Sequence, residues 1–276
     1  MARDGYDRDV SGIRTEIDLR YERVFGLEFV AGSDVGRVAD QLMDRRHGDS
    51  DDWAVVVTPN VDHLVRYESN HDERAVAESA ALVLPDGAPI VWVSTMAGVP
   101  LRSRVTGSGL FCEWWPRVAK EQCPVVAVVA GDEVGRRLQR ENPATTVIVP
   151  PVFELDDHDT IEQITEQIID STVATGAMFV VLGISMPKHH RLARRLSERR
   201  LPPGSRYPAV LLLGASAEFY TGTRRRAPKI LQQLGLEWVH RLVGDPRRMA
   251  RRYLVDDMRF IPIAAREVRR RRTAAA

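Results

Sequence analysis

Short apolar runs alternate with stretches of mixed polarity over most of the chain. Runs of four to six residues, rich in valine, isoleucine and leucine and ended by turn-forming residues, predict buried strands at 25–30, 53–57, 81–84, 125–130, 145–149, 178–182 and 209–213. Between them, apolar residues recur at spacings of three and four, which predicts helices at 33–43, 61–67, 73–81, 90–96, 107–120, 133–140, 161–168 and 187–200. Strands that alternate with helices favour a mostly parallel sheet with helices on both faces.

The same pattern divides the chain into three parts. Residues 1–20 are polar and lack periodicity, so we expect a disordered leader. Residues 21–225 carry the strands and helices of one Rossmann-like α/β core, because 276 residues leave little room for a second domain. Residues 226–276 begin at a break, Ala227–Pro228, and continue with helical spacing and many arginines. We expect this last part to be a C-terminal, helical and basic appendage.

Basic charge is concentrated at the C-terminal end, although the formal net charge of the chain is only +1. From Arg247 onward, ten arginines stand against Asp256, Asp257 and Glu267, and the remainder of the chain is therefore acidic. Phe260–Ile263 forms an apolar wedge between basic clusters, as in a peripheral helix on an anionic lipid surface. A nucleic acid is not an expected partner, because few aromatic residues accompany the arginines and no DNA- or RNA-binding motif is present.

The cysteines and the N-terminus indicate the compartment. Cys112 and Cys123 lack a metal-binding spacing, so neither a zinc site nor a disulfide framework is expected, and a reducing compartment is the default. The first ten residues are too charged for a signal peptide, and no apolar run reaches the length of a membrane span. We expect a cytoplasmic protein.

The residues that follow the predicted strands are the candidates for chemistry, because ligands of parallel sheets bind outside the carboxyl ends of the strands. Thr58 and Asn60 follow one strand, and Asp86 and Gly87 follow the next along the chain. A hydroxyl, an amide and a carboxylate can line one pocket there, in which the carboxylate accepts a proton from an attacking hydroxyl. The alternative is structural: Asn60 caps a helix and Asp86–Gly87 is a turn.

A third strand end runs from Gly183 to Lys188. Pro187 at a helix start leaves free backbone N–H groups, which together with the ammonium of Lys188 suit a phosphate. The adjacent His189 and His190 make a poor metal pair, because neighbouring helix positions point about a quarter-turn apart.

A fourth strand end, Gly214–Glu218, half-resembles the nucleophile elbow GxSxG. Ser216 would be the nucleophile and His240 lies downstream, so a serine hydrolase is an alternative. Glu218 stands where the last glycine of that motif belongs, which weakens it.

Other familiar signals are absent from the sequence. The stretch Gly107–Cys112 begins like a dinucleotide fingerprint but has a cysteine where its last glycine belongs. The sequence has no P-loop, and its Asp-x-Asp pairs lie in polar sequence rather than at the end of a strand. A metal clamp for a diphosphate is therefore not expected.

Segments at these strand ends occur in the order typical of one protein family. They are TPNVDHL at 58–64, LPDGAPIV at 84–91, RVTGSGLF at 104–111, GISMPKHH at 183–190, GASAEFYTGTRRRAP at 214–228 and RAPKILQQLGLEWVHRLVGDPRRMARRY at 226–253. In these segments the chain resembles the WecG/TagA/CpsF family of bacterial glycosyltransferases, and the last segment is the most specific.

The resemblance implies a reaction. Members of that family move an N-acetylmannosamine-type or related sugar from a UDP donor to a polyprenyl-diphosphate-linked acceptor, with inversion and without a metal or another cofactor. The product would enter cell-surface polysaccharide or another glycoconjugate. The partners would be a nucleotide sugar, a lipid-linked acceptor and the anionic inner face of the plasma membrane, and a homo-oligomer is compatible with this role.

The resemblance also implies roles for individual positions. Asp86 would be the catalytic base, with Thr58 and Asn60 lining its pocket. The donor side would be formed by Gly87, Arg104, Gly107, Gly183, Pro187, Lys188, Gly214, Ala215, Glu218 and Arg226. The diphosphate and the membrane would be met by Arg247, Arg248, Arg251, Arg252, Arg266 and Arg269.

The chain departs from the family's pattern on the donor side. Gly109 replaces an acidic residue of G-x-D-L, and His189 and His190 replace the last two residues of P-K-Q-E. Ala217 and Glu218 replace the pair F-D. Because the region of the base is intact, we expect the same type of reaction with a different sugar. The alternative is a non-catalytic relative that binds anionic lipid or glycolipid.

Overall fold

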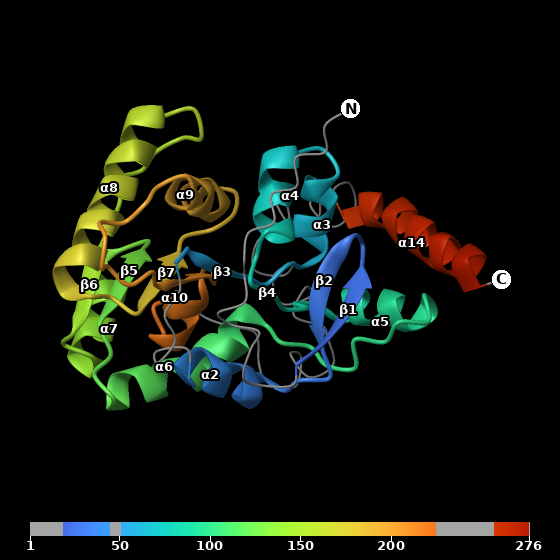
Figure 1. The fold of residues 1–276 in the computed structure, drawn as a ribbon, viewed down its shortest axis with the longest axis horizontal. Helices are drawn as coiled ribbons and strands as arrows, with labels where there is room; N and C mark the ends of the chain where they lie inside the picture. Colours follow the sequence, from blue (N-terminus) through green and yellow to red (C-terminus); the bar gives the residue numbers. More distant parts are fainter. Residues whose placement is uncertain (1–18, 45–50, 225–256, 276) are drawn as a thin grey trace.

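A computed structural model of the chain describes residues 19–44, 51–224 and 257–275, which form a sheet with helices on both faces (Figure 1). The eight strands of this described part lie in the order β1-β2-β4-β3-β8-β7-β5-β6. Their bounds are β1 Arg20–Val24, β2 Leu27–Ala31, β3 Ala54–Val57, β4 Leu82–Val83, β5 Val125–Val129, β6 Thr145–Ile148, β7 Phe179–Gly183 and β8 Ala209–Leu212. The β1–β2 pair is antiparallel and the other pairs are parallel. The predicted α/β fold is confirmed.

Helices cover both faces of the sheet. Their bounds are α2 Val35–Asp44, α3 Val61–Tyr67, α4 His71–Glu78, α5 Ala88–Met96, α6 Gly107–Lys120, α7 Asp132–Glu141, α8 His158–Thr175, α9 Lys188–Ser197, α10 Ser216–Tyr220, the 3-10 turn η3 Asp257–Arg259 and α14 Phe260–Ala275. In Figure 1, α3, α4, α8 and α9 lie on one side of the sheet, and α2, α6, α7 and α10 lie on the other.

The sheet is buried on both faces because successive strand residues point in opposite directions. In β3, Val55 and Val57 belong to one apolar core, and Ala54 and Val56 belong to the other. Strands of this kind read as continuous apolar runs, which is why the sequence pattern finds them. The four core side chains predicted on α6 are fully buried: Leu110, Phe111, Trp114 and Trp115.

Strand β1 is not predicted by the sequence pattern. It pairs with β2 through a turn at Phe25 and Gly26, whose φ angles are 54° and 80°. β1 is an edge strand and carries charged residues, so its sequence RYERV lacks the alternation of apolar and polar residues that would predict a strand. The strand expected from Phe25 begins at Leu27 instead. Leu19 is buried and Arg20 belongs to β1, whereas residues 1–18 of the expected leader lie outside the described residues.

Helix ends differ from the predictions by a few residues. Asp34, not Ser33, caps α2, because its Oδ1 accepts a hydrogen bond from the N–H of Arg37 at 2.9 Å. The helix expected at 73–81 begins earlier, since Asn70 Oδ1 accepts from the N–H of Glu73 at 3.0 Å. Where several short polar residues precede a helix, the local backbone decides which of them becomes the cap.

The apolar sequence of α5 predicts a helix that is buried on all sides, but in the structure one side of α5 is exposed. Trp92 is 62% exposed and Met96 is 57% exposed, whereas Ile90 and Val93 are buried. A helix that is apolar all round gives no periodic signal for the face that meets the core. The apolar surface left on α5 is therefore a feature of the tertiary structure.

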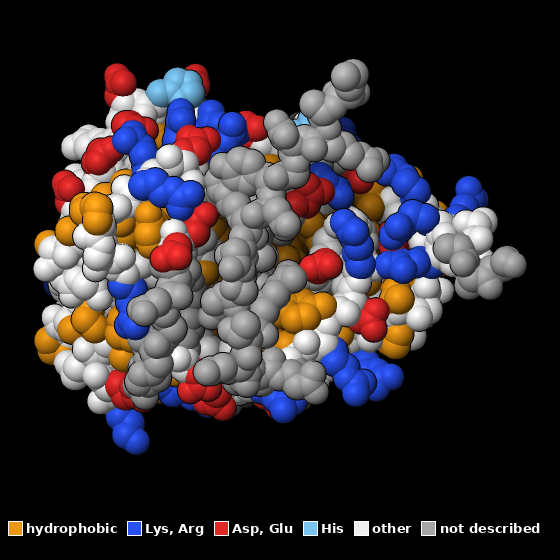
Figure 2. Space-filling model, in the orientation of Figure 1, with side chains coloured by type: hydrophobic (Ala, Val, Ile, Leu, Met, Phe, Trp, Pro, Cys, Tyr) orange, Lys and Arg blue, Asp and Glu red, His pale blue; other side chains and the backbone are white. Residues whose placement is uncertain are grey.

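Helix α14 packs against the core. Phe260 and Ile263 are buried, and the ring of Phe260 lies 5.8 Å from that of Phe25 between centroids. The apolar wedge predicted for a lipid surface thus turns two residues toward the protein, while Ile261 stays 56% exposed. Figure 2 shows Lys and Arg side chains gathered at the end of the molecule formed by α14.

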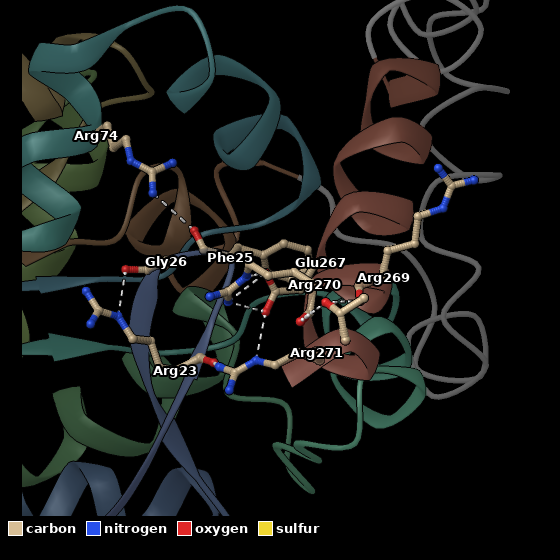
Figure 3. A network of polar contacts seen from close by, with 9 residues as sticks. Arg23, Phe25, Gly26, Arg74, Glu267, Arg269, Arg270 and Arg271 are labelled. Atoms are coloured by element: carbon tan, nitrogen blue, oxygen red, sulfur yellow. Dashed lines mark hydrogen bonds and ion pairs between the residues drawn. The ribbon is translucent and has the colours of Figure 1, made fainter. Parts of the chain in front are cut away.

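A polar network holds the last turns of α14 (Figure 3). The carboxylate of Glu267 is buried and accepts hydrogen bonds from Arg270 at 2.8 Å and from Arg271 at 3.3 Å. Arg271 also donates to the backbone carbonyl of Arg23 on β1. A buried carboxylate requires such partners, so these arginines serve the docking of the helix.

Candidate active site

A cavity of about 330 Å³ lies at the carboxyl ends of the central strands. It opens where β3 and β8 are neighbours, the point at which the chain order reverses between the two halves of the sheet. Parallel sheets bind their ligands at such a point. The described residues that line it are Thr58, Asn60, Asp62, His63, Asp86, Gly107, Ser108, Ser185, Met186, His189, Leu212, Leu213, Gly214, Ala215, Ser216, Phe219 and Arg224.

Asp86 follows β4 and lies in this cavity. The backbone N–H of Gly107, the first residue of α6, donates a hydrogen bond to its Oδ2 at 3.3 Å. Its own N–H donates to the carbonyl of Pro59 at 3.0 Å, which ties the ends of β4 and β3 together. A carboxylate at a helix N-terminus is stabilised in its charged form by the helix dipole.

The turn after Asp86 requires glycine. Gly87 has a φ of 143°, a conformation that other residues rarely adopt, and it precedes the first turn of α5. Gly87 itself is not among the residues that line the cavity. The glycine of the Asp86–Gly87 segment is therefore needed for the turn that directs the Asp86 side chain into the cavity.

Thr58 and Asn60 follow β3 and line the same cavity. Asn60 also caps α3, because its Oδ1 accepts from the N–H of His63 at 3.3 Å. The structural and the functional interpretation of Asn60 are therefore compatible. The backbone N–H of Asn60 in turn donates to His63 Nδ1 at 3.3 Å, which completes a capping box, and this nitrogen lies 2.8 Å from Asn60 Oδ1.

The ends of β7 and β8 supply the opposite wall. Gly214 and Ala215, predicted on the donor side, line it together with Ser185 and Met186. Gly183 does not, and its role is packing: a Cβ there would lie 2.9 Å from the carbonyl oxygen of Val128.

Lys188 and Pro187 do not line this cavity. The ammonium of Lys188 lies 4.4 Å from the ring centroid of Phe153, in a cation–π contact. Pro187 lines a separate pocket beside Asn70 and Arg191. Neither residue is among the described residues of the cavity lining, and the phosphate site expected at the start of α9 stays a prediction.

Glu218 and Arg104, also predicted on the donor side, are not among the described residues that line the cavity. Glu218 lies outside the lining, and burial raises its pKa, with Arg224 opposing the shift at 3.7 Å. Arg224 lines the cavity instead. Arg104 is exposed and is not part of the lining. Outside the described residues lie Arg226, Arg247, Arg248, Arg251 and Arg252, together with the helices expected between 226 and 256.

Three histidines meet beside the cavity, and this is the part of the site that sequence reasoning missed. The ring centroids of His63 and His189 are 6.1 Å apart and those of His189 and His190 are 4.7 Å apart. Burial lowers the pKa of His189 to about 4, with the backbone of Ile184 opposing in part, and it lowers the pKa of His190 as well. A signal for His63 existed, since it stands three residues after Asn60, on the same first helical turn.

The hydrolase interpretation finds little support in this geometry. Ser216 is buried, and its hydroxyl donates a hydrogen bond to the carbonyl of Leu213 within its own turn. The proposed partner His240 lies outside the described residues.

Metal sites and membrane spans were sought in the described ranges. Within 19–44, 51–224 and 257–275, no group of three or more His, Cys, Asp or Glu side chains is placed to hold a metal ion. Over the same residues, no helix has the length and the apolar content needed to cross a membrane.

Comparison with known protein families identifies this architecture. The family model described as glycosyl transferase WecG/TagA/CpsF matches residues 23–274. The match includes the strand ends that form the cavity and extends into α14. The chain therefore belongs to the WecG/TagA/CpsF family of glycosyltransferases.

Proposed function

We propose that this glycosyltransferase uses Asp86 as the general base of an inverting transfer. The observation that supports the proposal is the place of its carboxylate, in a cavity at the switch point of the sheet and bonded to the N–H of Gly107. Asp86 accepts the proton of the acceptor hydroxyl while that oxygen attacks the anomeric carbon of the donor. UDP leaves from the opposite face of the sugar, so that the anomeric configuration inverts.

The leaving diphosphate requires positive charge near the cavity. Arg224 is the arginine in the lining formed by the described residues. Arginine pairs with phosphate oxygens through two parallel N–H bonds, which suits this task. We assign the leaving-group side to the wall with Arg224, Gly214 and Ala215, supported by the C-terminal arginines of the family motif.

The donor is a UDP-linked sugar of the N-acetylmannosamine type or a related one, and the acceptor is a polyprenyl-diphosphate-linked sugar. Family membership supports both, and it favours an enzyme over a non-catalytic lipid binder. The product serves a cell-surface polysaccharide or glycoconjugate. The histidines at the cavity support a sugar different from the one that the family's usual glutamine and carboxylate serve.

The acceptor places the enzyme at the inner face of the plasma membrane, and one side of the molecule suits that contact. Trp92 and Met96 are exposed on α5, which packs against α14, and Ile261 is exposed on α14 itself. Arg269 and Arg272 are exposed on the same helix. Exposed tryptophan and arginine together match the headgroup region of an anionic leaflet. Arg266, also expected to meet lipid, instead pairs with Glu68 at 2.7 Å.

The test is transfer by Asp86→Asn, measured as UDP release with a panel of UDP-sugars and a polyprenyl-diphosphate-sugar acceptor. The amide has nearly the same shape as the carboxylate but cannot take the proton, so turnover falls by about two orders of magnitude or more. The affinity for the donor stays nearly unchanged. Asp62→Asn is the matched control, because this carboxylate lines the same cavity without a proposed chemical role. Near-normal turnover of Asp86→Asn would refute the assignment.

A further inference from the structure

The first turn of α3 closes a ring of hydrogen bonds in the cavity wall. Asn60 Oδ1 accepts from the N–H of His63, and the N–H of Asn60 points back to His63 Nδ1, both at 3.3 Å. In either tautomer the imidazole is bonded to Asn60, because an unprotonated Nδ1 accepts from that N–H and a protonated Nδ1 donates to Oδ1, 2.8 Å away. Both residues line the cavity.

This ring of hydrogen bonds fixes the orientation of the Asn60 amide. Its oxygen faces the helix, where it meets the N–H of His63. The opposite orientation would set the amide NH2 against that N–H, so that two donors would face each other. The NH2 end therefore points away from the helix, and it forms no hydrogen bond among the described residues. Its two N–H donors are left for an oxygen of a bound substrate.

The amide lies beside the proposed base. Pro59, which precedes Asn60, accepts a hydrogen bond from the N–H of Asp86 at 3.0 Å. The Cβ of Asn60 is 4.0 Å from the place that a Cβ on Gly87 would take. The ends of β3 and β4 thus present the amide and the carboxylate next to each other, and an oxygen held by the amide lies near the group that accepts the proton.

Histidine suits this position better than the residue that usually closes a capping box. That residue is glutamate or glutamine, three positions after the cap. The cavity already holds the carboxylates of Asp62 and Asp86, and glutamate would add a third negative charge where a diphosphate binds. The imidazole closes the ring of hydrogen bonds without that charge. It is also confined, because its centroid lies 6.1 Å from that of the buried His189 and 5.8 Å from that of the buried His190.

We propose that His63 is a positioning residue that acts through Asn60, by turning the amide NH2 toward a substrate oxygen beside Asp86. The inference rests on the proposed function, because it takes this cavity to be the site of sugar transfer. One helical turn then serves both the start of α3 and the site.

The test measures UDP release, as kcat/KM for the donor, in a double-mutant cycle. Asn60→Ser keeps an oxygen that caps the helix but has no NH2. His63→Leu removes the ring nitrogens, whereas His63→Gln keeps a donor and an acceptor. We expect His63→Leu to lower kcat/KM by at least about tenfold and His63→Gln to recover it to within about threefold of the wild type. In the Asn60→Ser background, His63→Leu causes no further loss, because the group that it positions is gone.

The control is Asn70→Ala. Asn70 caps α4 in the same way, through a 3.0 Å bond from the N–H of Glu73, but it lies outside the cavity lining. This variant should lose stability, as cap variants do, and keep kcat/KM within about twofold of the wild type.

Two results would overturn the proposal. One is an equal loss of kcat/KM in Asn70→Ala and His63→Leu, since the effect would then come from a lost cap alone. The other is an undiminished effect of His63→Leu in the Asn60→Ser background, since His63 would then act independently of Asn60. Both leave the proposed function intact as long as Asp86→Asn is inactive, whereas near-normal turnover of Asp86→Asn refutes the base and not the coupling of Asn60 with His63.

Discussion

Gly107 is the position where one added methyl group tests the geometry of the site. A Cβ there would lie 3.0 Å from Thr58 Oγ1, 3.4 Å from Ser216 Oγ and 3.6 Å from a methyl carbon of Leu213. Thr58 and Ser216 are buried, so neither hydroxyl swings away freely. The Gly107→Ala variant must therefore move the start of α6 by a few tenths of an ångström, and the N–H that holds Asp86 moves with it.

The two effects of this change differ in size. Overpacking a core typically lowers the free energy of unfolding by about 1–3 kcal/mol, and the single tight contact of Gly107→Ala should cost about 1 kcal/mol. Alanine recovers up to about 1 kcal/mol of helix propensity, so the net change in stability is small. Catalysis is more sensitive, because displacements of about 1 Å cost up to about a hundredfold in rate. We expect turnover to fall by at least about tenfold while the melting temperature shifts by no more than about 4 °C.

The assay pairs UDP release at saturating donor with thermal unfolding. Gly131→Ala is the control, since a Cβ at Gly131 meets nothing within 4 Å and the residue lies at the start of α7, outside the cavity lining. Wild-type turnover in Gly107→Ala would show that the N–H bond to Asp86 does not position the base. A rate loss no larger than that of Gly131→Ala would lead to the same conclusion.

Three further predictions concern α14, the buried His189 and the exposed face of α5. Phe260→Ala should lower the free energy of unfolding by about 3–5 kcal/mol, because the ring is buried. Ile261→Ala should change it by less than about 0.5 kcal/mol, because this side chain is exposed. Urea unfolding of the two variants measures this difference, and equal stability of both would show that α14 is not docked on the core. Burial lowers the pKa of His189 in the folded protein to about 4, from an ordinary value of 6.5. Between pH 6.5 and pH 4 the unfolded chain therefore binds a proton at this residue that the folded protein does not bind. The free energy of unfolding then falls as the pH is lowered from 6.5 toward 4. Unfolding at pH 7 and pH 5 should differ by about 2 kcal/mol more in the wild type than in His189→Gln. Trp92→Ser should lower the fraction of protein that sediments with anionic vesicles and leave the free energy of unfolding unchanged. If the variant and the wild type bind the vesicles equally, α5 does not contact the membrane.

The fold was predictable where the pattern is local. Strands buried on both faces read as continuous apolar runs, and helix α6 with its four core side chains was found at its observed bounds. The strand ends that carry Thr58, Asn60 and Asp86 followed from the same runs. Edge strand β1 escaped because its charged side chains hide its period, and α10 escaped because five residues are too few for a helical period to show.

Other parts of the candidate site depend on contacts between residues far apart in the chain. The strand order sets β8 beside β3, and only this pairing brings Gly214 to the cavity that holds Asp86. His63 and His189 meet because α3 and α9 cover the same face of the sheet, which no spacing in the sequence records. Lys188 precedes His189 by one residue, yet it lies over Phe153, because neighbouring helix positions point in different directions.

The amino-acid sequence by itself determined most of the strands and helices, though not β1 and α10, as well as the family of the chain and the polar residues at the strand ends. These depend on local periodicity and on motifs, both of which are written along the chain. Only the tertiary structure decided which strand ends share a cavity, which face of α5 stays exposed and that Phe260 of α14 turns to the core. Such choices are made by packing between distant segments, where burial of apolar area and pairing of polar groups select one arrangement from many with the same local pattern.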